Sequence, residues 1–237
     1  MKDLFGQAIL DYQTGNDPQD LITETSISEP DEMSVAYLFR SFEDMPKIEQ
    51  KALTLAHGKI LDVGCGAGSH SLYLEQNGLD VTPIDISPSA IKACQLRGLP
   101  KATVADVLDF DGKFDTLLLL MNGTGIFGRY ANITRYLQKL KSLLAPGGQI
   151  LIDSSDIIYM FDQDEDGGHW IDTSRDYYGE LTFHLTYKGL QETPFDWLYL
   201  DFNTLQTAAN ANGLQCDLVL EGDHYDYLAR LTPVAMV

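Results

Sequence analysis

The chain has 237 residues, of which 44% are hydrophobic and 22% charged, a balance that suits a single domain with a sizeable core. Its formal net charge of −19 at pH 7 would repel a phosphate backbone, so we expect no nucleic-acid partner. Because no apolar run approaches the roughly 18 residues of a membrane span, the N-terminus lacks a secretory-signal pattern and only three cysteines occur, we expect a cytoplasmic protein with no membrane association.

From residue 59 onward, short apolar runs alternate with helical patterns, which predicts an α/β fold with a doubly wound, mostly parallel sheet. Five strands are predicted first, at 59–63, 79–85, 102–107, 114–121 and 149–154. Helices are predicted between them at 69–77, 87–98 and 132–144, the last capped by Asn132. Pro83 falls inside the second strand, where it removes a hydrogen-bond donor, so we expect a bulge or break there.

The segments on either side of this core, 59–154, complete one predicted domain over 1–237. Residues 1–58 are expected to form a helical cover with a loop at 13–32. Residues 155–200 are expected to insert an acidic lid and an antiparallel hairpin, with strands at 181–187 and 195–200. Residues 201–237 are expected to close the fold with a helix and two strands, giving seven strands with an antiparallel last strand.

The stretch ILDVGCGAGSH, residues 60–70, places glycines at 64, 66 and 68 between a predicted strand and a helix. Such a turn directs backbone N–H groups and the positive end of the helix dipole at one point, which favours an anionic group. Missing Cβ atoms would let that group approach the backbone closely. A tight turn that only closes a strand–helix unit is the alternative reading of the same glycines.

Other polar residues end the neighbouring strands. Asp85 lies 21 positions after Gly64, at a spacing where a carboxylate can hold the hydroxyls of a ribose. Asp106 ends the third predicted strand, and Asn122 follows the fourth. The carboxyl ends of parallel strands share one edge of the sheet, so we expect these residues to converge on one crevice.

Together these stretches resemble the class I S-adenosylmethionine-dependent methyltransferases, from about Tyr37 to the C-terminus. Five motifs carry the resemblance: ILDVGCGAG, PIDIS, VADVLDF, FDTLLLLMNG and LKSLLAPGGQILID. The resemblance implies a Rossmann-like methyltransferase fold and S-adenosyl-L-methionine as cofactor. The glycine spacing GxGxG, in place of GxGxxG, favours this cofactor over a dinucleotide.

The resemblance also assigns roles to individual residues. The residues it implies at the methionine end and the sulfonium are Asp62, Gly64, Gly66, Met121 and Asn122. Those it implies at the nucleoside are Asp85 for the ribose, Asp106 for the adenine amino group, and Ile86 and Val107 for the faces of the ring. Tyr37 and Arg40 are implied at the cofactor carboxylate, although a packing role for both stays open.

No catalytic residue follows from the sequence, because a sulfonium already activates its methyl group and a base is needed only for a protonated acceptor. Candidates near the expected mouth of the crevice are Asn122, Asp153, Asp156, Tyr159, His169 and His70. Aromatic rings expected either at an acceptor or in the core are Trp170, Tyr177, Tyr178 and Trp197. Residues 162–167 match half of a calcium loop, but Thr173 replaces the required glutamate, so we expect no metal.

We therefore expect methyl transfer to a small-molecule acceptor. A non-catalytic S-adenosylmethionine-binding protein and, less favoured by the glycine spacing, a nicotinamide-dependent oxidoreductase are the alternatives. The sequence leaves a homodimer open and does not identify the acceptor atom.

Overall fold

The computed structural model describes residues 2–164, 166–171 and 175–234. Its larger sheet has seven strands in the order β11-β12-β7-β6-β3-β4-β5. The strands are β3 (Lys59–Val63), β4 (Asp80–Asp85), β5 (Thr103–Val104), β6 (Phe114–Leu119), β7 (Leu144–Ser155), β11 (Leu214–Glu221) and β12 (Asp226–Pro233). The last strand, β12, is antiparallel to both of its neighbours, and β3 to β7 pair in parallel. The predicted fold class is confirmed.

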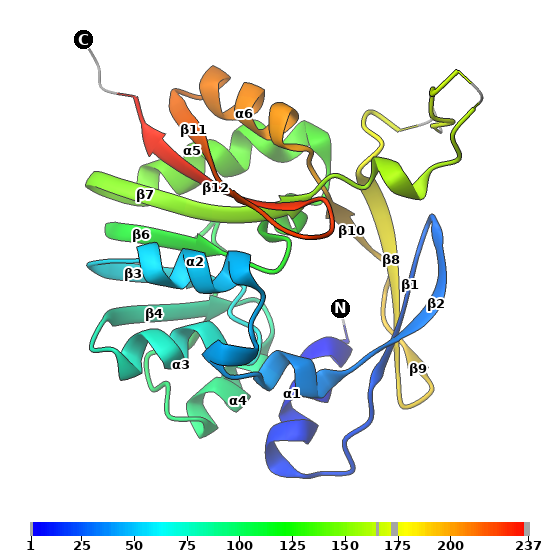
Figure 1. Cartoon of the computed structure of the whole chain (residues 1–237). Coiled ribbons are helices and arrows are strands. Elements are labelled where there is room, and N and C mark those ends of the chain that lie inside the picture. The colour runs from blue at the N-terminus through cyan, green and yellow to red at the C-terminus, as the bar shows by residue number, and fades with distance from the viewer. Residues whose placement is uncertain (1, 165, 172–174, 235–237) are drawn as a thin grey trace.

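Helices cover both faces of this sheet because successive strand residues point to opposite sides. The helices are α1 (Leu4–Thr14), α2 (Lys47–Leu55), α3 (Ser69–Gln76), α4 (Pro88–Leu96), α5 (Ile133–Leu143) and α6 (Phe202–Ala211). Leu61, on one face, belongs to the buried cluster that includes α5 and α6, whereas Ile60, on the other, packs in the cluster that includes α2. Figure 1 shows α2 across one face and α5 behind the sheet. No helix among these described residues is both long and apolar enough to span a bilayer.

A second sheet stands across from the carboxyl ends of the parallel strands (Figure 1). Its strand order is β10-β8-β1-β2, and the short β9 pairs with β8. Its strands are β1 (Leu21–Thr25), β2 (Ser28–Met33), β8 (Glu180–Tyr187), β9 (Leu190–Gln191) and β10 (Phe195–Leu198). The hairpin predicted in the insertion is confirmed by the antiparallel pairing of β8 with β10.

The prediction of a loop at 13–32 inside an all-helical cover was wrong. This segment forms the hairpin β1–β2, and β1 pairs along β8, with Thr25 opposite Phe183. The sequence SEPDEM of β2 reads as a loop because it carries Pro30 and three acids. An outermost strand tolerates both, since charges and proline protect an exposed edge.

The break expected at Pro83 does not occur: β4 pairs continuously with β3, and Asp62 lies opposite Pro83. The backbone carbonyl of Ile84 accepts from Gly64 and Cys65 on the β3 side, and that of Asp85 accepts from Ala105 on the other side. Pro83, two residues before Asp85, therefore directs its nitrogen toward β5. Because β5 pairs only with Ile84 and Asp85, Pro83 removes no ladder hydrogen bond.

Two smaller predictions also need correction. The strand predicted at 102–107 is reduced to β5, because it lies at the edge of the sheet and pairs with a single neighbour. Asn132 precedes α5, as predicted, but its side chain does not cap the helix and donates instead to the carbonyl of Phe127 at 3.0 Å. The predicted apolar stripe of α5 is buried all the same.

Candidate functional site

The glycine loop joins β3 to α3, and its three glycines serve two different purposes. All three have positive φ angles, of 73° at Gly64, 53° at Gly66 and 81° at Gly68. A Cβ on Gly68 would lie 2.6 Å from Leu99 Cδ1, so this position needs glycine for packing. A Cβ on Gly64 or Gly66 would meet no heavy atom within 4 Å. Those two residues therefore present bare backbone to open space.

Asp85 closes one side of this loop. Its Oδ2 accepts from the backbone N–H of Gly66 and its Oδ1 from that of Ser87, both at 2.9 Å. Burial raises the pKa of the carboxyl above its ordinary value, although the two N–H groups act in the opposite direction. A carboxylate has about four acceptor positions, so two remain for a ligand.

The residues expected around an adenine ring differ in accessibility. Ile86 is 55% exposed and Asp106 is exposed, with its Oδ1 accepting from Leu108 N at 2.8 Å. Val107 is only 4% exposed and belongs to the core cluster on the α5 side of the sheet. Ile86 and Asp106 are thus free to meet a ligand, while most of Val107 is already packed.

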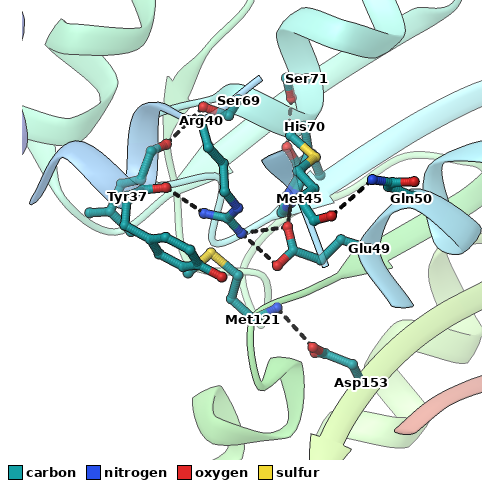
Figure 2. A network of polar contacts seen from close by, with 12 residues as sticks. Tyr37, Arg40, Met45, Glu49, Gln50, Ser69, His70, Ser71, Met121 and Asp153 are labelled. Atoms are coloured by element: carbon teal, nitrogen blue, oxygen red, sulfur yellow. Dashed lines mark hydrogen bonds and ion pairs between the residues drawn. The ribbon is translucent and has the colours of Figure 1, made fainter. Parts of the chain in front are cut away.

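Three ionisable side chains, Arg40, Glu49 and His70, meet in a buried group that we call the ion cluster (Figure 2). Arg40 Nη2 donates to both carboxylate oxygens of Glu49, at 2.5 Å to Oε1, and His70 Nε2 lies 2.6 Å from Glu49 Oε2. Burial alone raises the pKa of Glu49, but His70 and Arg40 outweigh it and hold the pKa below its ordinary value. The cluster ties α2 to α3 and fixes the Arg40 guanidinium.

Arg40 nevertheless keeps unused hydrogen-bond donors. Its Nη1 donates to the carbonyl of Tyr37 at 2.7 Å, and its Cζ lies 4.1 Å from the centroid of the Tyr37 ring. Its Nε is buried and has no hydrogen-bond partner among the described residues. A buried N–H of a charged group without a partner is costly, which indicates that a ligand acceptor belongs there.

The loop after β6 is strained and held by one carboxylate. Met121 and Asn122 are consecutive non-glycine residues with positive φ, at 67° and 59°, a conformation that concentrates at functional sites. Asp153 Oδ2 accepts from Met121 N at 3.1 Å and Oδ1 from Gly123 N at 2.8 Å. Burial raises the pKa of Asp153 to about 6. Figure 2 shows this contact beside the ion cluster.

Asp62 is buried at the end of β3, directly before the glycine loop. Its Oδ2 accepts from Ser71 Oγ at 2.6 Å, and burial raises the pKa of the carboxyl. Asp62 thus anchors the first turn of α3 beneath the loop.

Residues 36–191 match the family model of the methyltransferase domain, well over half of the chain. The chain belongs to this methyltransferase family. A crystal structure of an S-adenosylmethionine-dependent methyltransferase from Bacteroides fragilis, in complex with S-adenosyl-L-homocysteine, is 46% identical to it, with a TM-score of 0.92. That comparison covers 99% of this methyltransferase and 96% of the other chain.

Curated relatives match a shorter region. A ubiquinone biosynthesis O-methyltransferase from Xanthomonas euvesicatoria pv. vesicatoria is 29% identical over 111 residues, which are 43% of this methyltransferase and 45% of the relative. A 2-heptyl-1-hydroxyquinolin-4(1H)-one methyltransferase from Mycobacteroides abscessus is 32% identical over 124 residues, 48% and 52% of the two chains. The methyltransferase spans about half the length of these relatives.

The sequence-predicted catalytic candidates do not gather at one point of the methyltransferase. Asn122 Oδ1 lies 2.9 Å from Ser154 Oγ, and its amide donates to Leu198 O, so the side chain links the β6 loop to β10. Asp156 accepts from Tyr178 Oη at 2.7 Å, and His169 Nδ1 lies 3.2 Å from Phe161 O. Tyr159 lines one cavity beyond the end of β7, and Asp156 lines another.

The acidic loop is described only in part. Residues 165 and 173, on which the calcium-loop comparison depends, lie outside the described residues. Within the described segments of the methyltransferase, no group of three or more His, Cys, Asp or Glu side chains is arranged to hold a metal ion.

Sequence reasoning missed Glu49, the centre of the ion cluster. A signal was present, because Glu49 shares one helical face of α2 with Ala52 and Leu53, both buried. An acid on an apolar helical stripe indicates a buried ionic partner, but the partners His70 and Arg40 come from other segments.

Proposed function

We propose that this methyltransferase transfers the methyl group of S-adenosylmethionine to a small-molecule acceptor. One observation carries the proposal: Gly64 and Gly66, directly after β3, present bare backbone to open space. The family membership and the 46% identical relative crystallised with S-adenosyl-L-homocysteine support it.

The residues present fit this cofactor. Gly64 and Gly66 would lie against its methionine part, and Arg40 Nε would donate to its carboxylate, with Tyr37 beside it. Asp62 would not need to contact the cofactor: by accepting from Ser71, it would hold the glycine loop against α3. The two unused acceptor positions of Asp85 would receive the ribose hydroxyls. Exposed Asp106 and Ile86 would meet the adenine, and Val107 would form the floor beneath it.

When bound, the cofactor supplies a methyl group already activated by its positive sulfur. The task left to the chain is to place an acceptor in line with the methyl–sulfur bond and to keep water out. Such alignment can remove about 7 to 11 kcal/mol of a barrier. Met121 and Asn122, fixed by Asp153, would set the wall beside the sulfur. Asn122, Asp156, Tyr159 and His169 stay candidates for any proton transfer.

Calorimetric titration with S-adenosylmethionine, S-adenosyl-L-homocysteine and NAD tests the cofactor. We expect the first two to bind and NAD not to bind; tight binding of NAD alone would favour an oxidoreductase. Formation of S-adenosyl-L-homocysteine with a panel of amines, phenols and carboxylates then tests catalysis. Binding without turnover on any acceptor would favour the non-catalytic alternative.

We further propose that residues 1–237 act as one domain in a reducing compartment such as the cytoplasm. The three cysteines, Cys65, Cys94 and Cys216, are buried free thiols, as expected where disulfides do not form. A homodimer stays a prediction, for which light scattering of the purified protein is the direct measurement.

A further inference from the structure

A cavity of about 630 Å³ lies between the two sheets, where the chain leaves β7. One wall is the inner face of the second sheet. Thr25 lies opposite Phe183 in the pairing of β1 with β8, and Thr23 lies opposite Asp31 in the hairpin, so these side chains share a face. At its far end the same face packs against α1 through Leu185 and its neighbours.

The opposite wall comes from the carboxyl end of the larger sheet. Ser155 lies two residues beyond Asp153 on β7, so both side chains point to the same face of that strand. Asp226 pairs with Ser155 from β12, and Tyr159 follows shortly after β7. Asp153 in turn accepts from the backbone N–H groups of Met121 and Gly123, in the loop after β6. The strand that brings Ser155 to this cavity therefore also holds, through Asp153, the loop that is proposed to lie beside the sulfonium.

The charges that line this cavity have one sign. Glu29, Asp31 and Asp226 contribute carboxylates, and no lysine or arginine is among the described residues that line it. None of the three forms an ion pair with another described residue. His224, on the turn before β12, is the remaining ionisable side chain beside the tyrosines. A concave surface of this kind attracts cations and repels anions.

Aromatic rings supply the rest of the lining. Phe183, Tyr159 and Tyr199 contribute rings, joined by the apolar side chains of Ile157 and Leu181. Tyr199 lies near Asp153, and burial raises the pKa of its hydroxyl to about 12, so it stays neutral at pH 7. Ring faces near carboxylates suit an ammonium group through cation–π attraction, and the apolar side chains suit a carbon body.

Resting on the proposed function, we infer that this cavity is the acceptor site and that the acceptor is a small primary or secondary amine with an apolar body. The amine enters as an ammonium ion and loses one proton to water. Its lone pair then forms the new carbon–nitrogen bond while the methyl–sulfur bond of S-adenosylmethionine breaks and leaves its electron pair on sulfur. A phenol would have to become an anion among three carboxylates, which such surroundings oppose.

The test compares four acceptors that each contain a benzene ring and differ in the polar group: benzylamine, benzyl alcohol, phenol and benzoate. Each is titrated into the protein saturated with S-adenosyl-L-homocysteine and assayed for methyl transfer from S-adenosylmethionine. We expect benzylamine to bind and to be methylated, and the other three to bind at least tenfold more weakly. Methylation of phenol or benzoate in preference to the amine, or no binding of benzylamine at 10 mM, would overturn the inference.

Two variants test whether the carboxylates that line the cavity bind the amine. The double variant Glu29→Gln, Asp31→Asn changes exposed residues and should raise the benzylamine KM, or its Kd, about tenfold, with cofactor affinity unchanged. Glu24→Gln is the matched control, because Glu24 lies on β1 between Thr23 and Thr25 and points to the opposite face. Equal amine affinity in all three proteins would contradict the inference. Absence of S-adenosylmethionine binding would instead refute the proposed function itself.

Discussion

Arg40 shows how a single side chain can be both a structural and a binding element. Its Nη groups donate to Glu49 and to the Tyr37 carbonyl, whereas its buried Nε has no hydrogen-bond partner among the described residues. Sequence reasoning placed Arg40 at the cofactor carboxylate through family resemblance, and that placement stays a proposal. The ion pair that orients Arg40 is a finding of the structure, because it joins residues nine positions apart from different elements.

Replacing Glu49 by glutamine should destabilise the protein. The change leaves the buried Arg40 guanidinium without an anionic partner, so we expect the free energy of unfolding to fall by about 3 kcal/mol. Urea unfolding measures this change, and Glu43→Gln, an exposed acid near α2, serves as the control. A Glu49→Gln variant within about 0.5 kcal/mol of the wild type would mean that the ion pair contributes nothing.

Asp153 gives a prediction with a defined sign. Its pKa is raised from 3.8 to about 6, so the folded state holds this proton more tightly than the unfolded chain. The contribution of this carboxyl to stability is fullest below pH 3.8 and is lost as the pH rises through 6. Between pH 7 and pH 5 the wild type should therefore gain about 1 kcal/mol relative to Asp153→Asn, which cannot titrate.

Thermal unfolding of both proteins at pH 5, 6 and 7 measures that difference, and effects common to both cancel. The variant should be less stable at every pH. Asp153 uses two oxygens to accept from Met121 N and Gly123 N, whereas an asparagine has only one side-chain oxygen. A constant gap between the two curves would show that Asp153 does not titrate in this range.

At the scale of elements, the glycine loop separates two roles that look identical in the sequence. Gly66→Ala places a methyl group in open space at a φ of 53°, which costs about 1 kcal/mol of backbone strain. Gly68→Ala adds a contact of 2.6 Å with Leu99 Cδ1 to similar strain. We expect Gly66→Ala to weaken S-adenosyl-L-homocysteine binding at least tenfold and Gly68→Ala chiefly to lower Tm.

Calorimetry and thermal unfolding on the two variants separate the roles. If Gly66→Ala bound S-adenosyl-L-homocysteine as tightly as the wild type, the open space beside this glycine would not be the cofactor site.

Helices and strands whose apolar periodicity lies within one segment could be predicted from the sequence. Strands that form only by pairing with a distant segment could not. The strands around Leu61 and Leu117 and the stripe of α5 follow from apolar periodicity within one segment. The hairpin β1–β2 has few apolar residues and exists because β8, more than 150 positions away, offers an edge. The proposed acceptor cavity was predicted only in part: of its rings, Tyr159 was named from the sequence as a site candidate, whereas Phe183 and Tyr199 were not.

At the scale of the whole molecule, the two sheets contribute different parts of the proposed site. The larger sheet gathers Asp85, Asp153 and the glycine loop at the carboxyl ends of its parallel strands, as such folds do. The second sheet, built from both the N-terminal segment and the insertion, stands opposite (Figure 1). Its residues line one side of the cavity between the two sheets. Core motifs in one stretch thus predict the cofactor, while the proposed acceptor cavity is lined by segments that only folding brings together.

The most direct test of the proposed cofactor site is calorimetric titration of S-adenosyl-L-homocysteine into the wild type and into Asp85→Ala. Asp80→Ala, on the same strand, is the control. We predict one binding site per chain in the wild type and the control, and at least tenfold weaker binding in Asp85→Ala, because the ribose would lose its acceptor. Equal affinity in all three proteins, or no binding by the wild type, would contradict the account.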